Sequence, residues 1–326
     1  MLTDNESLYR KQIMRIGIAM LIFLGCTYVT EYAFLLADII LSNMRAVPRT
    51  VLLSLIEAFL YSAMFLVPAF VLKKLIKDLP HQEIRTTFQI PRTFPFYLFA
   101  TIGIAYAARG LSALILRLFE GVAFVGEAQA TAPIQNFEIV LMIITTAVVP
   151  AFVEEYLFRG VILGAMRPFG RTSAVVVSAF CFALMHGNFS QLLYTFAAGL
   201  VLGYIYCKLN SLWAVVIIHF CNNFLGIVRT VIVDRLDDYM GVVAIYLSEL
   251  IVLLLGIVGI VYLILHSKKR NDLFENGCFE RDVPADPEYA EVEIPRARRL
   301  RLFWSPTMIV FAVLSVISML GLLIPL

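Results

Sequence analysis

Long apolar stretches recur along this sequence, each close to the length that a helix needs to cross a lipid bilayer. A hydrocarbon core about 30 Å thick is spanned by roughly 20 apolar residues, because an α-helix rises about 1.5 Å per residue. Inside lipid, every backbone polar group must be satisfied within the protein, which such stretches achieve as helices. The sequence therefore predicts an all-α fold, a polytopic transmembrane helix bundle of about eight to nine spans.

The candidate spans cover residues 16–42, 51–72, 96–118, 137–165, 172–187, 189–207, 211–233, 240–266 and 303–325. Composition supports a bilayer as the main solvent, since 60% of the residues are hydrophobic and 15% are charged. Soluble domains usually carry about 25% charged residues. The net charge of +2 is too small to indicate nucleic acid. The predicted partner is therefore the membrane lipid bilayer.

Basic residues alternate between the loops largely as the positive-inside rule expects. Lys and Arg cluster before the first span and after the second, whereas the loop 119–136 has Glu120 and Glu127 without Lys or Arg. Arg45 and Arg49, in the first loop, are the exception. The pattern predicts an integral membrane protein with a cytoplasmic N-terminus. Short loops without targeting signals favour a bacterial cell membrane.

The fourth span carries three charged residues in an otherwise apolar helix, Glu154, Glu155 and Arg159. A charge at the bilayer centre costs about 2.5–3.5 kcal/mol on insertion scales, so such residues indicate function. Glu155 and Arg159 are four residues apart, which places opposite charges on one helix face. Glu154 points about 100° away from Glu155 and needs another partner. Pro150 should kink the helix and free a carbonyl around Thr146.

Polar residues in later spans lie at depths compatible with Glu154. From a predicted cytoplasmic turn near residues 169–170, Glu154 lies about 15 residues before and His186 about 17 after, which is roughly 22–26 Å along their helices. His219 and Asn223 are four residues apart and share one face of the seventh span. We therefore expect these groups to meet.

This set contains the groups that hydrolysis by an activated water requires. A carboxylate can act as the base, a neutral imidazole can hold the water, and donors can stabilise the oxyanion. The sequence supplies these types as Glu154, His186, His219 and Asn223. Zinc is an alternative cofactor with Glu154, His186 and His219 as candidate ligands, although the sequence has no HExxH helix. The residues alone leave both chemistries open.

Each polar residue also has a structural interpretation. A lone intramembrane His is commonly a packing residue, and Asn often joins transmembrane helices through hydrogen bonds. Isolated acids in other spans fit helix pairing, polar cavities or neutral protonated forms, namely Glu31, Asp38, Glu57 and Glu249.

Three short motifs occur in order, each inside an apolar helix: EExxxR at 154–159, FxxxH at 182–186 and HxxxN at 219–223. Together they resemble the CPBP intramembrane proteases, a family that includes the CAAX-processing endopeptidases and the Abi proteins linked to bacteriocin processing and immunity. The resemblance covers roughly 137–233. It implies a CAAX-protease-like helical core.

The resemblance also implies a role for each motif residue. Glu154 would activate the water with His186, while His219 and Asn223 would stabilise the oxyanion. The structural or orienting residues would be Glu155, Arg159 and Phe182. Family members are described both as metalloendopeptidases and as metal-independent glutamate proteases. Zinc thus stays open, and we favour glutamate-activated water.

The chain is predicted to have three parts. Residues 1–136 form N-terminal transmembrane helices, and 137–233 form the CPBP-like catalytic core. Residues 234–326 form C-terminal transmembrane helices with a charged cytoplasmic linker at 267–302.

The predicted function is that of an intramembrane endopeptidase, a hydrolase acting on a membrane-associated peptide or a protein, prenylated proteins included. Two other classes stay open. A proton-coupled transporter would use the same carboxylates and histidines as a relay, but no inverted repeat is visible. A non-catalytic membrane scaffold or immunity protein would retain the core without the activity.

Overall fold

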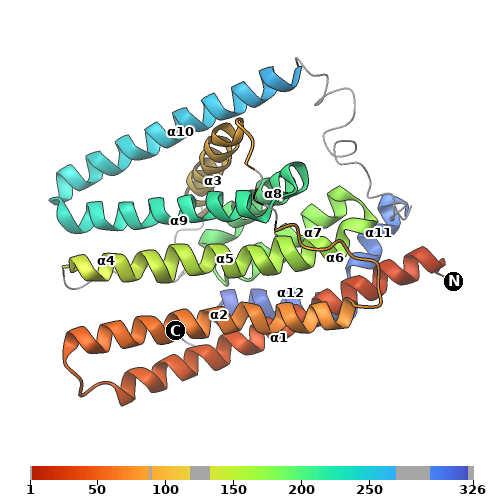
Figure 1. The fold of residues 1–326 in the computed structure, drawn as a ribbon, viewed down its shortest axis with the longest axis horizontal. Helices are drawn as coiled ribbons and strands as arrows, with labels where there is room; N and C mark the ends of the chain where they lie inside the picture. Colours follow the sequence, from red (N-terminus) through yellow and green to blue (C-terminus); the bar gives the residue numbers. More distant parts are fainter. Residues whose placement is uncertain (1, 87, 89, 118–132, 269–293, 322–326) are drawn as a thin grey trace.

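The computed structural model describes residues 2–321 except 87, 89, 118–132 and 269–293, and this part of the chain consists of helices and their connections without a strand (Figure 1). The predicted all-α fold class is confirmed. The longer α-helices are α1 (Asp4–Ile40), α2 (Ala46–Ile76), α3 (Phe94–Arg117), α7 (Arg171–Leu184), α8 (Phe189–Leu209), α9 (Leu212–Arg235), α10 (Asp238–Lys268) and α12 (Pro306–Met319).

The predicted fourth span is a helix from Asn136 to Phe169 that changes its winding along its length. Its parts are α4 (Asn136–Met142), the π-helical η1 (Ile143–Val148), α5 (Val149–Glu155), the π-helical η2 (Tyr156–Leu163), α6 (Gly164–Met166) and the 3₁₀ turn η3 (Arg167–Phe169). Figure 1 shows α4, α5 and α6 between the α1–α2 hairpin and α9. Charged residues on this span can therefore be covered from two sides.

Among the described residues, seven helices are long and apolar enough to cross a membrane, and an eighth span is counted if α11 (Arg296–Phe303) and α12 form one broken span with a 62° bend. The predicted polytopic bundle is thus confirmed, with seven or eight spans in the described part. The predicted span 172–187 is shorter than expected. Helix α7 has 14 residues, or about 21 Å, because the chain turns at Gly187 with φ of 62° and Asn188 caps α8.

Some predicted features fall outside the described residues. These are Glu120 and Glu127 of the loop 119–136 and most of the linker 267–302. The division into parts at 136 and 233 stays a prediction.

Two of the isolated intramembrane acids join neighbouring helices, as helix pairing predicts. Oδ1 of Asp38 on α1 lies 2.6 Å from Nη2 of Arg49 on α2. One of the two basic residues that depart from the positive-inside pattern therefore has an acidic partner. Glu249 of α10 lies 2.5 Å from Arg229 of α9.

Helices α3 and α10 approach each other at a pair of glycines. A Cβ on Gly103 would lie 2.5 Å from the Cα of Gly256, whereas a Cβ on Gly110, two turns along α3, would meet nothing within 4 Å. Small residues let transmembrane backbones pack at this distance. The contact therefore depends on glycine at position 103.

We expect Gly103→Ala to lower the free energy of unfolding by about 1–3 kcal/mol, because the added methyl group forces the helices apart. Gly110→Ala is the matched control and should be neutral or slightly stabilising, since alanine favours a helix. Thermal unfolding midpoints of both variants in detergent micelles provide the comparison. Equal midpoints would show that the glycine contact does not hold α10 against α3.

Candidate active site

The helix that carries the charged residues departs from α-helical winding on both sides of Pro150. Proline has no N–H for the carbonyl of Thr146, and that carbonyl accepts a hydrogen bond from Nδ2 of Asn223 at 3.1 Å. In η2, the carbonyl of Phe158 accepts from Oγ of Ser178 at 2.8 Å. Such π-helical turns free backbone groups for other partners. The predicted free carbonyl at Thr146 is confirmed, and a residue of the HxxxN motif uses it.

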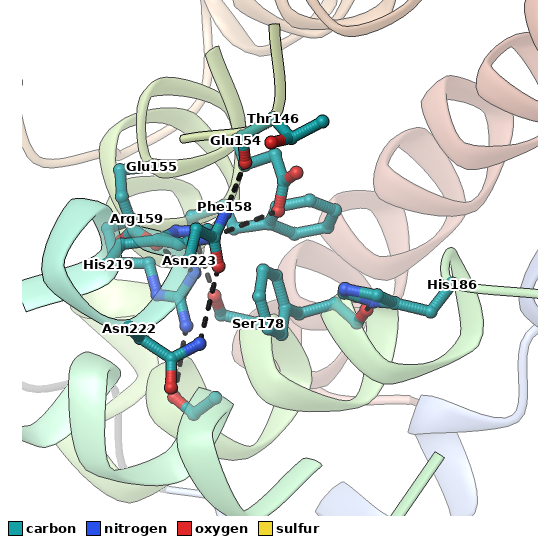
Figure 2. Close-up of polar contacts among 12 residues, drawn as sticks. Thr146, Glu154, Glu155, Phe158, Arg159, Ser178, His186, His219, Asn222 and Asn223 are labelled. Atoms are coloured by element: carbon teal, nitrogen blue, oxygen red, sulfur yellow. Dashed lines mark hydrogen bonds and ion pairs between the residues drawn. The ribbon is translucent and has the colours of Figure 1, made fainter. Parts of the chain in front are cut away.

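Glu155 lies at the centre of a buried ionic group. Its Oε1 accepts a hydrogen bond from Nη1 of Arg159 at 2.8 Å and lies 2.8 Å from Nδ1 of His219. Glu155 and Arg159 are fully buried, and His219 is 6% exposed. The predicted pairing of Glu155 with Arg159 is confirmed. The carboxylate also fixes the imidazole of α9 against the fourth span (Figure 2).

The guanidinium of Arg159 is placed by two further contacts. Its Nη2 lies 3.4 Å from the carbonyl of Gly199 on α8, and its Cζ lies 4.4 Å from the centre of the Phe182 ring on α7. Phe182 in turn packs edge-on against Phe158 at 5.2 Å. One charged side chain therefore connects three helices. A cation over an aromatic ring is stabilised when both are away from water.

Glu154 faces a different set of neighbours from Glu155. Its Oε1 accepts a hydrogen bond from the hydroxyl of Tyr61 on α2 at 2.5 Å. Its Oε2 lies 3.8 Å from Nε2 of His219 and has no hydrogen-bond partner among the described residues. The side chain is 3% exposed. Both carboxylates thus approach His219, and the separate partner that Glu154 was expected to need is Tyr61, which sequence reasoning missed.

His186 lies at the end of α7, set apart from the group formed by Glu155, Arg159 and His219 (Figure 2). Its Nδ1 is 2.7 Å from the carbonyl of Phe182 and therefore donates to it, which leaves Nε2 as the nitrogen with a lone pair. The Phe182 ring lies 4.9 Å from the His186 ring and 6.0 Å from the His219 ring. The predicted meeting of His186 with Glu154 stays a prediction.

Asn223 belongs to a short amide chain on α9. Nδ2 of Asn222 donates to Oδ1 of Asn223 at 3.3 Å, while Nδ2 of Asn223 reaches Thr146. These contacts orient the Asn223 amide beside the fourth span. One of its two amide hydrogens is left for another acceptor.

The candidate zinc ligands Glu154, His186 and His219 are not gathered into one site. No group of three His, Cys, Asp or Glu side chains in the described part of the chain is placed to hold a metal ion. Glu154 and His219 approach each other, but His219 is also held by Glu155 through Nδ1. Of the three candidate ligands, the contact seen is therefore the 3.8 Å approach of Nε2 of His219 to Oε2 of Glu154.

Comparison with known proteins covers this same segment. Residues 136–225 match the family described as type II CAAX prenyl endopeptidase Rce1-like. This segment is thus similar to the CAAX-type membrane proteases. All three motifs lie inside the CAAX-type segment, whereas Tyr61 lies outside it.

A protein of Bacillus subtilis (strain 168) named "Putative membrane peptidase YdiL" is 29% identical over 86 residues, which are 26% of this chain and 34% of that protein. The chain thus spans about a third of the length of this relative. No solved structure matches. The similarity supports a membrane protease of the CAAX type in general terms.

Proposed function

We propose that this chain is an intramembrane endopeptidase in which Glu154 activates the water that hydrolyses a peptide bond. The observation that carries the proposal is the state of the Glu154 carboxylate. It is buried, and one of its oxygens is held by Tyr61. The other oxygen lies 3.8 Å from Nε2 of His219 and has no hydrogen-bond partner among the described residues. A carboxylate held in this way has one oxygen available as a general base.

The reaction uses the free oxygen first. Oε2 of Glu154 takes a proton from water, and the hydroxide attacks the carbonyl carbon of the substrate. The lone pair on Nε2 of His186 accepts the other water hydrogen and orients it. When the tetrahedral intermediate collapses, Glu154 returns the proton to the departing amine nitrogen as the C–N bond breaks.

The oxyanion that forms on the carbonyl oxygen needs donors already in place. The Glu155 carboxylate lies at Nδ1 of His219. Because this carboxylate balances the charge, His219 can carry a proton on both ring nitrogens. Nε2 of His219 and the remaining amide hydrogen of Asn223 then serve as donors. Glu155 and Arg159 act indirectly by fixing His219 and Phe182.

The substrate is a membrane-associated peptide or protein, with prenylated proteins as one candidate class. The name of the Bacillus relative, a membrane peptidase, supports the peptide class. We further propose that the protein lies in a bacterial cell membrane. Its N-terminus would be in the cytoplasm, because the basic loops favour that orientation.

The test uses purified full-length protein in liposomes with a library of quenched peptides, some prenylated and some not. Wild type is compared with His186→Ala, with and without a zinc chelator. Cleavage that His186→Ala reduces at least about 10²-fold and the chelator leaves intact supports glutamate-activated water. Chelator-sensitive cleavage that added zinc restores would instead support the metalloprotease alternative.

A further inference from the structure

A tyrosine from outside the CAAX-type segment contacts the carboxylate to which we assign the base. Tyr61 lies on α2, and its hydroxyl donates to Oε1 of Glu154 at 2.5 Å. The matched segment begins at residue 136. Part of the environment of Glu154 is therefore supplied by the N-terminal hairpin.

The Tyr61 ring is held by packing that is independent of Glu154. It lies 4.9 Å from the ring of Phe65, one turn along α2. Phe65 is fully buried and contacts Phe23 of α1 at 5.1 Å and Phe158 of η2 at 6.3 Å. This row of rings connects α1, α2 and the helix of Glu154. The hydroxyl is thus presented by a rigid support, as a preorganised site requires.

The two oxygens of Glu154 differ because of this contact. Oε1 is occupied by the phenol, whereas Oε2 faces His219 without a hydrogen bond among the described residues. Without the phenol, the carboxylate could rotate and offer either oxygen to His219. A misoriented base loses rate even when the substrate still binds.

We propose that Tyr61 is the positioning residue for the general base, holding one oxygen of Glu154 so that the other meets the water. The inference rests on the function proposed above. It makes the α1–α2 hairpin part of the working site. Substrate contact is not required of Tyr61, so its loss should change turnover and leave binding unchanged.

The experiment compares Tyr61→Phe with Tyr156→Phe in purified full-length protein in liposomes. Phenylalanine keeps the ring row and removes only the hydroxyl. Tyr156 lies two residues from Glu154, and its hydroxyl has no hydrogen-bond partner within the described part of the chain, so it is the matched control. We expect kcat to fall about 10- to 100-fold in Tyr61→Phe with KM changed less than about 2-fold, and Tyr156→Phe to match wild type.

A second readout does not depend on turnover. The carboxylate stretching band of Glu154 is identified in the infrared by its loss in Glu154→Gln, and it should shift in Tyr61→Phe but not in Tyr156→Phe. The role of Tyr61 would be overturned if Tyr61→Phe left the band unshifted. It would also be overturned if Tyr61→Phe left kcat unchanged while Glu154→Gln abolished activity. Either result would leave the proposed function standing. A fall in kcat that only follows a smaller folded fraction would assign Tyr61 to stability and also overturn it. If Glu154→Gln keeps full activity, the proposed function itself fails.

Discussion

Glu154→Gln is expected to lower kcat for peptide cleavage by about 10²- to 10⁴-fold, the range that a general base contributes. The amide keeps the shape of the side chain and can still accept a hydrogen bond from Tyr61, so the fold should persist. It cannot take a proton from water. The measurement is initial cleavage rate at saturating peptide, with the unfolding midpoint recorded for the same sample.

Glu83→Gln is the matched control for this substitution. The Glu83 side chain is 78% exposed and pairs with His81 at the surface, where ion pairs contribute little. Its kcat should equal that of wild type. Equal activity of Glu154→Gln and Glu83→Gln would remove Glu154 from the reaction.

Arg159→Leu is expected to produce the largest loss of stability, about 3–5 kcal/mol in the free energy of unfolding. The reason is that Glu155 would stay buried without its cation, and breaking a buried pair from one side costs this much. Arg159 is fully buried and also bonds to Gly199 and covers Phe182. Denaturation in mixed micelles, followed by far-UV circular dichroism, measures the change.

The double variant Glu155→Leu with Arg159→Leu separates charge from packing. Removing both charges leaves no isolated ion, so much of the lost stability should return. The double variant should not cleave peptide, because His219 loses the carboxylate at Nδ1. A double variant as unstable as Arg159→Leu would show that the guanidinium acts through its packing and not through the ion pair.

Local spacing in the sequence predicts the contacts that lie within one helix. The pairing of Glu155 with Arg159 follows from a separation of four residues, and the distance of 2.8 Å confirms it. The free carbonyl of Thr146 follows from the missing N–H of Pro150 in the same way. Apolar length predicts the all-α transmembrane bundle, since bilayer thickness fixes the length of a helical span.

Contacts between helices are less accessible to such reasoning. Tyr61 carries no signal in its own span, because tyrosine is common where an apolar body and a polar tip are both useful. Its contact with Glu154 joins residues 93 positions apart and depends on how α2 packs against α5. The second role of Glu155, holding His219, depends likewise on the placement of α9.

Helix ends and helix type were the other features that apolar length could not predict. Helix α7 ends at Leu184 because Gly187 and Asn188 turn the chain. The π-helical η1 and η2, like the α-helical parts of this span, are mostly apolar with a few polar residues. Their winding follows from tertiary partners such as Ser178 and Asn223, which bind the freed carbonyls.

The most direct test of the central claim is product formation from one quenched peptide by purified protein in liposomes, with wild type and Glu154→Gln measured side by side and the products identified by mass spectrometry. The account predicts two fragments whose masses sum to that of the peptide plus one water. Wild type should form them in the presence of chelator, and Glu154→Gln should form them at least about 10²-fold more slowly. Equal cleavage by both proteins would contradict it.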